Sequence, residues 1–187
     1  MRIGLVGEAP NDTQSIKNLM EKNYNSGFEF FFMLDRINGS KLDSQKTKRF
    51  LRIEYETKSP DLIIFIRDLD SILPNKLKLN GRKLYFTNSN RVVDKNGIYL
   101  LHIYEIEALI LSDIEVFNEI YNSKLSLVKN PMLIEEPKEY LREKESKYNE
   151  SHNPDIFKKV RFEKALECDY FNQFILKFNS IVELHKQ

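Results

Sequence analysis

The sequence predicts an α/β fold with a mainly parallel sheet flanked by helices, followed by a C-terminal helical extension. Short continuous apolar runs, typical of strands buried on both faces, occur at 3–6, 62–66 and 98–104. Segments with helical spacing of apolar residues lie between them, and this alternation is typical of parallel βαβ units. At 187 residues we expect a single domain, with a core at 1–115 and the extension at 116–187.

Strands and helices alternate through the first part of the chain. The expected strands are 1–7, 28–33, which is rich in phenylalanine, and 62–66. The expected helices are 13–23, capped by Asn11 or Asp12, and the basic segment 44–58.

The second part of the chain begins with weaker signals. We expect a short helix or loop at 73–81 that ends in a turn at Asn80-Gly81, and irregular or edge-strand structure at 82–97. A fourth strand at 98–104 leads into a helix that starts at Glu105, where the apolar period changes from two to about 3.6. In the extension, 135–150 is a charged helix or loop, and 155–185 is an amphipathic segment that packs back on the sheet.

Composition and charge bear on the partners and the compartment that we expect for this protein. The 29 basic and 28 acidic residues leave a net charge of +1, so binding to phosphates requires a local patch. The basic segment 46–58 with Arg82, Lys83 and Arg91 could form one, although a solvated helix face is favoured. One cysteine, Cys168, fits a reducing cytosol. The N-terminus does not resemble a signal peptide, and no run of about 18 apolar residues occurs, so we expect a cytoplasmic protein without membrane contact.

Carboxylates follow three of the expected strands. Glu8 comes after the first strand, Asp68 and Asp70 after the third, and Glu105 and Glu107 after the fourth. Because ligands bind beyond the carboxyl ends of parallel strands, these side chains should converge on one crevice. Carboxylate oxygens suit Mg²⁺ or Mn²⁺, so the pattern predicts metal-assisted phosphoryl chemistry. The alternative is structural, with these residues serving as helix caps or surface-turn residues.

Other chemistries are less well supported. Arg67 could bind a substrate phosphate or neutralise Asp68. The three histidines are not spaced for zinc, and His102 fits a core position inside an apolar strand. The sequence has neither a Walker lysine motif nor a glycine-rich dinucleotide fingerprint.

The Gly7-Glu8 corner and the Asp68-x-Asp70 pair resemble the Toprim (topoisomerase–primase) domain, whose signature is a glutamate after the first strand and Asp-x-Asp after a later hydrophobic strand. The stretch 104–113, together with Cys168 followed by Phe171, is similar to a group of short, stand-alone bacterial Toprim-like proteins. The resemblance covers 1–115, with a weaker match at 155–185. It implies a Rossmann-like parallel sheet with helices on both faces and a Mg²⁺-dependent site for breaking or joining phosphodiesters.

Carried over by position, the resemblance implies that Glu8 is the general acid/base and that Asp68 and Asp70 are metal ligands. Glu107 or Glu105 would be a further acidic contributor. Ala9 departs from the usual Glu-Gly-x-x-Asp form, and none of the nine tyrosines can be assigned as a topoisomerase nucleophile. We therefore expect a nuclease or related phosphotransferase acting on DNA or RNA. The alternative is a non-catalytic module that binds a partner, such as an ATPase encoded alongside it in a bacterial defence system.

Overall fold

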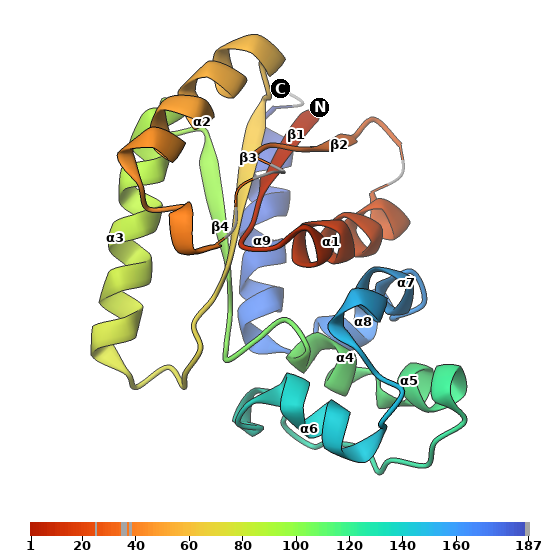
Figure 1. Cartoon of the computed structure of the whole chain (residues 1–187). Helices are drawn as coiled ribbons and strands as arrows, with labels where there is room; N and C mark the ends of the chain where they lie inside the picture. Colours follow the sequence, from red (N-terminus) through yellow and green to blue (C-terminus); the bar gives the residue numbers. More distant parts are fainter. Residues whose placement is uncertain (25, 35–36, 38, 186–187) are drawn as a thin grey trace.

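The computed structural model describes residues 1–187 except 25, 35–36, 38 and 186–187 (Figure 1). The described strands are β1 (Arg2–Val6), β2 (Glu29–Phe32), β3 (Leu62–Asp68) and β4 (Gly97–His102). The α-helices are α1 (Pro10–Asn23), α2 (Gln45–Lys58), α3 (Lys76–Val92), α4 (Ala108–Ser112), α5 (Ile114–Tyr121), α6 (Pro137–Lys144), α7 (Asn153–Phe157), α8 (Phe162–Ala165) and α9 (Asp169–Leu184). The short 3₁₀ helices are η1 (Gly39–Lys41), η2 (Pro131–Leu133) and η3 (Glu150–His152).

The four strands form one parallel sheet in the order β2-β1-β3-β4. β1 pairs with β3 from Ile3 opposite Leu62 to Val6 opposite Phe65, and β3 pairs with β4 as far as Asp68 opposite His102. The carboxyl ends of β1, β3 and β4 therefore lie at the same edge. This arrangement confirms the expected parallel α/β sheet.

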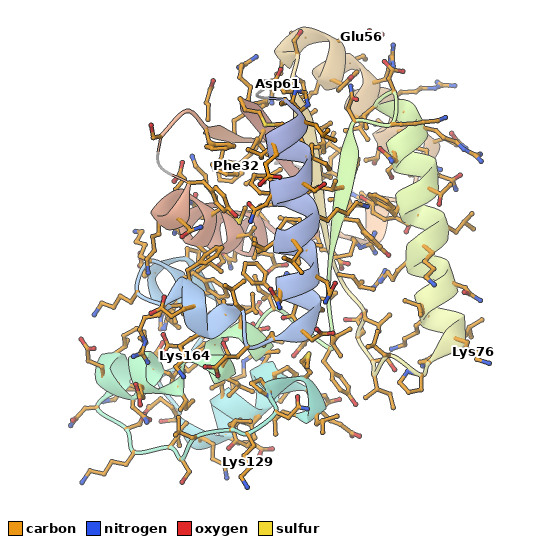
Figure 2. All side chains as sticks on the ribbon, turned by 180° about the vertical axis from the view of Figure 1, so that it is seen from behind. Phe32, Glu56, Asp61, Lys76, Lys129 and Lys164 are labelled. Carbon is orange, nitrogen blue, oxygen red and sulfur yellow. The ribbon has the colours of Figure 1, made fainter. Side chains whose placement is uncertain are left out.

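Helices cover both faces of this sheet (Figure 1). On one face, α1, α9 and the extension enclose a core that includes Leu5, Ile64, Leu100 and Phe178. On the other face, α2 and α3 cover a smaller core around Phe65. Figure 2 shows α9 lying along the sheet, with Lys76, at the start of α3, and Lys129 of the extension both in the lower half of the view.

The expectation of irregular or edge-strand structure at 82–97 is wrong for most of that segment. Residues 76–92 form the continuous helix α3, and the Asn80-Gly81 pair lies inside it and not at a turn. The helix begins at Asn75, whose side chain accepts a hydrogen bond from the backbone nitrogen of Lys78 at 3.1 Å. The Asn75 cap and the burial of Tyr85 in the core around Phe65 outweigh the low helix propensity of the Asn-Gly pair.

The C-terminal extension is more divided than the periodicity predicts. The helix expected from Glu105 is split at Asp113 into α4 and α5. The segment expected at 155–185 consists of separate helices, of which α9 packs along β4. Arg161 lies between α7 and α8, and its backbone nitrogen donates to the buried carboxylate of Asp113 at 2.8 Å. This tertiary hydrogen bond lies at the residue that separates α4 from α5.

Cys168 is buried just before α9, as its small apolar character indicates, with its Sγ 3.7 Å from the carbonyl oxygen of Ala108. Across the described part of the chain, each helix is too short or too polar to cross a membrane.

Candidate functional site

An acidic pocket of about 320 Å³ opens at the carboxyl edge of the sheet. Seven of the described side chains that line it are carboxylates: Glu8, Asp12, Asp68, Asp70, Glu105, Glu107 and Glu150. The five carboxylates singled out from the sequence are among them, so the structure brings all of these together. We call this cavity the acidic pocket; the chemical roles of its residues stay predictions.

Glu8 enters the pocket from the loop between β1 and α1. Gly7 is required before it, since an added Cβ would lie 2.6 Å from the Cγ2 of Thr13 in the first part of α1. The carboxylate of Glu8 accepts a hydrogen bond from Nε of Arg67 and lies 3.7 Å from the guanidinium of Arg82. Two arginines from β3 and α3 therefore fix the orientation of this carboxylate.

Arg67 lies beneath the pocket and not on its surface. Its side chain is 4% exposed, its guanidinium lies over the ring of Tyr85 at 4.5 Å, and Asp43 lies 3.7 Å away. This arginine is placed to hold Glu8, whereas a substrate would meet the more accessible Arg82 first. The neutralisation of Asp68 that the sequence suggested for Arg67 is replaced by neutralisation of Glu8 and Asp43.

The end of β3 and the loop after it present Asp68 and Asp70 on the pocket side, with Leu69 buried between them. The pairing of β3 with β4 continues beyond the strands, because the backbone nitrogen of Asp70 donates to the carbonyl oxygen of Tyr104 at 3.0 Å. Asp70 and Tyr104 both have left-handed backbones, with φ of 54° and 58°. Such conformations cost on the order of 1–3 kcal/mol each outside glycine and cluster at functional sites.

Helix α3 holds the aspartate loop from the other side. Nε of Arg82 donates to the carbonyl oxygen of Asp68 at 2.7 Å, and Nζ of Lys78 donates to that of Asp70 at 2.5 Å. Arg82 also forms an ion pair of 2.7 Å with the carboxylate of Asp70. The helix that the sequence did not predict thus positions the Asp-x-Asp pair.

Asp12 is a pocket residue that the sequence reasoning treated as a helix cap. Helix α1 begins at Pro10, so Asp12 lies in its first turn and its side chain lines the pocket. Burial, followed by the charges of Glu107 and Glu8, raises the pKa of Asp12 to about 7. The available signal was its position four residues after Glu8, where the Glu-Gly-x-x-Asp form places its aspartate.

Asp68 shares this environment. Burial is the largest cause that raises the pKa of Asp68 well above its usual value, and the charge of Asp12 is the next. Among the described residues, no ion pair joins either carboxylate to a cation, in contrast to Glu8 and Asp70. Asp12 and Asp68 are therefore two mutually repelling, half-buried carboxyl groups in one pocket.

Glu107 and Glu105 meet residues of the extension. Glu107 is 3% exposed and accepts hydrogen bonds from Nδ2 of Asn153 at 2.8 Å and from the hydroxyl of Tyr148 at 3.2 Å. Burial raises the pKa of Glu107. Glu105 pairs with Nζ of Lys138 at 3.1 Å, and this lysine also lies 3.4 Å from Glu150. The extension thus closes the acidic pocket, which no local sequence signal indicated.

The donor set suits a hard divalent cation. The pocket offers carboxylate oxygens. Burial is the largest cause of the raised pKa values of Asp12 and Asp68, and the charges of neighbouring carboxylates, which a cation would offset, add to it. Within the residues that the structure describes, no three His, Cys, Asp or Glu side chains are already gathered closely enough to share one ion. The pocket fits Mg²⁺ or Mn²⁺ in its chemistry, and binding would require the carboxylates to rotate toward each other.

Comparisons of this chain with family models, with curated proteins and with solved structures found no match.

Proposed function

We propose that the acidic pocket is the active site of a Toprim-like, divalent-metal-dependent nuclease or related phosphodiester-processing enzyme that acts on nucleic acid. One observation carries the proposal. Asp12 and Asp68 are half-buried together at the carboxyl edge of a parallel sheet, and repulsion within the acidic cluster adds to the desolvation that raises their pKa values. Raised carboxyl pKa values of this kind cluster at functional sites, which supports the proposal.

Asp68 and Asp70 are the proposed ligands of Mg²⁺ or Mn²⁺, with Asp12 beside them and Glu107 or Glu105 as further acidic contributors. Bound there, the cation would polarise a phosphoryl oxygen and lower the pKa of a water molecule. Helix α3 contributes by fixing the backbone carbonyls of both aspartates, which keeps the two carboxylates on the pocket side.

Glu8 is the proposed general acid/base. In hydrolysis, its carboxylate takes a proton from the attacking water as the new phosphorus–oxygen bond forms, and solvent water protonates the leaving oxygen as the old phosphorus–oxygen bond breaks. Arg67 holds Glu8 from below in this role. Arg82 contacts both Glu8 and Asp70, so we propose that it, together with or in place of Arg67, binds the substrate phosphate.

The test is metal-dependent cleavage of single-stranded and duplex DNA and RNA by purified variants. Glu8→Gln should lose about 10²–10⁴-fold in rate while it keeps metal binding, because the amide retains the shape but does not exchange a proton. Asp68→Asn should lose both activity and metal binding. Glu183→Gln, an exposed substitution on α9, should retain full activity. Full activity in Glu8→Gln would contradict the mechanism.

A second candidate function is a non-catalytic interaction module that works with a partner such as an ATPase. The observation that favours it is the pairing of Glu8, Asp70 and Glu105 with arginine or lysine, which occupies carboxylates that a metal site would use. If the wild type cleaves none of the four substrates, alone or with any co-encoded ATPase that is found, this function replaces the nuclease.

A further inference from the structure

A second cavity, of about 520 Å³, adjoins the acidic pocket and shares Asp70 with it. Its walls come from α2, from the loop after β3 and from one side of α3. The side chains that carry the argument are Lys48, Leu69, Lys78, Arg82, Leu84 and Asn88. We call this space the α3 cavity.

The charge of the α3 cavity suits an anion. Lys48, Lys78 and Arg82 line it, and its two carboxylates already have cationic neighbours, Asp70 at 2.7 Å from Arg82 and Asp43 at 3.7 Å from Arg67. The surrounding helix strengthens this field, because α3 contains five lysines and arginines and no acidic residue. A phosphate that leaves the acidic pocket along α3 therefore meets favourable charge.

Beyond these charged groups, the α3 cavity has apolar and polar lining. Leu84 stands at its edge with 63% of its surface exposed, Leu69 lies fully buried behind its wall, and the amide of Asn88 offers one donor and one acceptor group. The volume lies within the roughly 300–1,000 Å³ typical of small-ligand sites. Apolar walls, one amide and flanking cations together match a nucleotide: a flat base joined through a sugar to phosphate.

Arg82 connects this cavity with the acidic pocket. Its guanidinium lies 2.7 Å from Asp70 and 3.7 Å from Glu8, and its Nε holds the backbone carbonyl of Asp68. A strand with one phosphate at Arg82 would place its neighbouring nucleotide against Leu84 and its bond to be cut beside Glu8.

We propose that the α3 cavity receives one unpaired nucleotide of the strand next to the cleavage position, so that the substrate class is single-stranded nucleic acid. This inference rests on the proposed function for the identity of the adjacent reaction. A base in a duplex is paired and stacked, and it would have to be extruded at a cost of a few kcal/mol before it could enter. An unpaired base enters without that cost.

The experiment measures binding of a fluorescent 12-nucleotide single strand, its duplex and a nucleoside monophosphate in EDTA, where cleavage is absent. Lys48→Glu and Leu84→Asp alter the α3 cavity. Their matched controls on α9, which covers the other face of the sheet, are Lys177→Glu and Leu176→Asp, with Leu176 56% exposed. Each variant is melted first, and exposed or half-buried positions were chosen so that folding is retained.

We expect the wild type to bind the single strand more tightly than the duplex or the monophosphate. Leu84→Asp should weaken this binding about ten-fold or more, because it sets a carboxylate beside the phosphates. Lys48→Glu should also weaken it and lower the salt dependence by about 0.7 in slope, the value for one lost contact to a single strand. The α9 controls should bind as the wild type does.

Three results would overturn the inference: equal or tighter binding of duplex, a monophosphate that binds as well as the strand, or unchanged binding in both Lys48→Glu and Leu84→Asp. Cleavage separates the two proposals. Strand binding that depends on Leu84 in a protein without nuclease activity would support the α3 cavity and refute the proposed function. Nuclease activity together with unchanged strand binding in Leu84→Asp would support the proposed function and refute the α3 cavity as a nucleotide site.

Discussion

Nε of Arg67, at the end of β3, donates a hydrogen bond to the carboxylate of Glu8, which follows the neighbouring strand β1. This buried arginine stabilises one carboxylate of the acidic pocket, and Arg82 does the same for Asp70. Asp12 and Asp68 have no such partner among the described residues, and repulsion in the pocket is concentrated on them. The first two predictions follow from this unequal distribution of cations.

Millimolar Mg²⁺ or Mn²⁺ should raise the melting temperature. A ligand that binds the folded state at a hundred times its Kd adds about 2.7 kcal/mol, which corresponds to roughly 5–10 °C for a chain of this size. Asp68→Asn should remove the metal-induced shift, and Asp155→Asn, in which an exposed carboxylate of α7 is changed, should retain it. A wild-type melting temperature unmoved by either metal would count against a metal site.

Metal binding should release protons near pH 6 and none near pH 9. The pKa of Asp12 in the folded, metal-free protein is about 7, above its ordinary value of 3.8, so the stability linked to this group is present below pH 3.8 and is lost as pH rises through 7. A cation requires the ionised carboxylate and therefore displaces the proton. Calorimetry in two buffers with different ionisation enthalpies measures this release, which Asp12→Asn should reduce; equal release at both pH values would refute the explanation.

His102 should make the protein less stable in acid. Burial lowers its pKa from 6.5 to about 3, so the unfolded chain binds a proton between these values while the folded chain does not. Its stability contribution is therefore present above pH 6.5 and is lost as pH falls toward 3, on the order of 3–5 kcal/mol in total. The raised pKa values of Asp12 and Asp68 change stability with pH in the opposite direction. The His102 contribution is therefore obtained as a difference, by comparing urea unfolding of the wild type and His102→Gln from pH 4 to 7. Parallel curves would show that His102 does not titrate as proposed.

Two glycines should respond oppositely to alanine. Gly81 lies inside α3 with open space around the position of a Cβ, so Gly81→Ala should stabilise the fold by about 0.5–1 kcal/mol. At Gly97, at the start of β4, a Cβ would lie 2.6 Å from Asn90 and from the ring of Phe65, so Gly97→Ala should destabilise it by about 1–3 kcal/mol. Thermal unfolding measures both changes. A destabilising Gly81→Ala would argue for a turn at that position.

The sheet could be predicted from the sequence because its signal is local. Residues 3–6 and 62–66 are continuous apolar runs, and burial on both faces leaves no other pattern open to them. The convergence of Glu8, Asp68 and Glu107 then follows from parallel topology alone. Helix α3 was missed because Asn80-Gly81 is a strong turn signal, and its opposing signals, the Asn75 cap and the buried face of Tyr85, are weak or non-local.

The closure of the acidic pocket could not be predicted from the sequence in the same way. Lys138, Tyr148 and Asn153 reach Glu105 and Glu107 across 33–46 residues of chain. Such pairings depend on how short helices pack, and neither charge nor periodicity specifies them. Asp12 is a different case. Its position four residues after Glu8 indicated a role in the pocket, but an aspartate at that position is equally typical of a helix cap, so the sequence did not decide between the two.

Tyr148 and Asn153 hold Glu107 through hydrogen bonds that only the extension supplies. The boundary near residue 115 therefore falls inside α5 and separates Glu107 from the two side chains that hold it. A fragment that ended there would expose Glu107 to water and leave Glu105 without Lys138, so the acidity of the remaining carboxylates would change along with the shape of the opening. Exchange of this extension between related chains would thus be expected to retune the proton affinity of the site without altering a residue on the sheet.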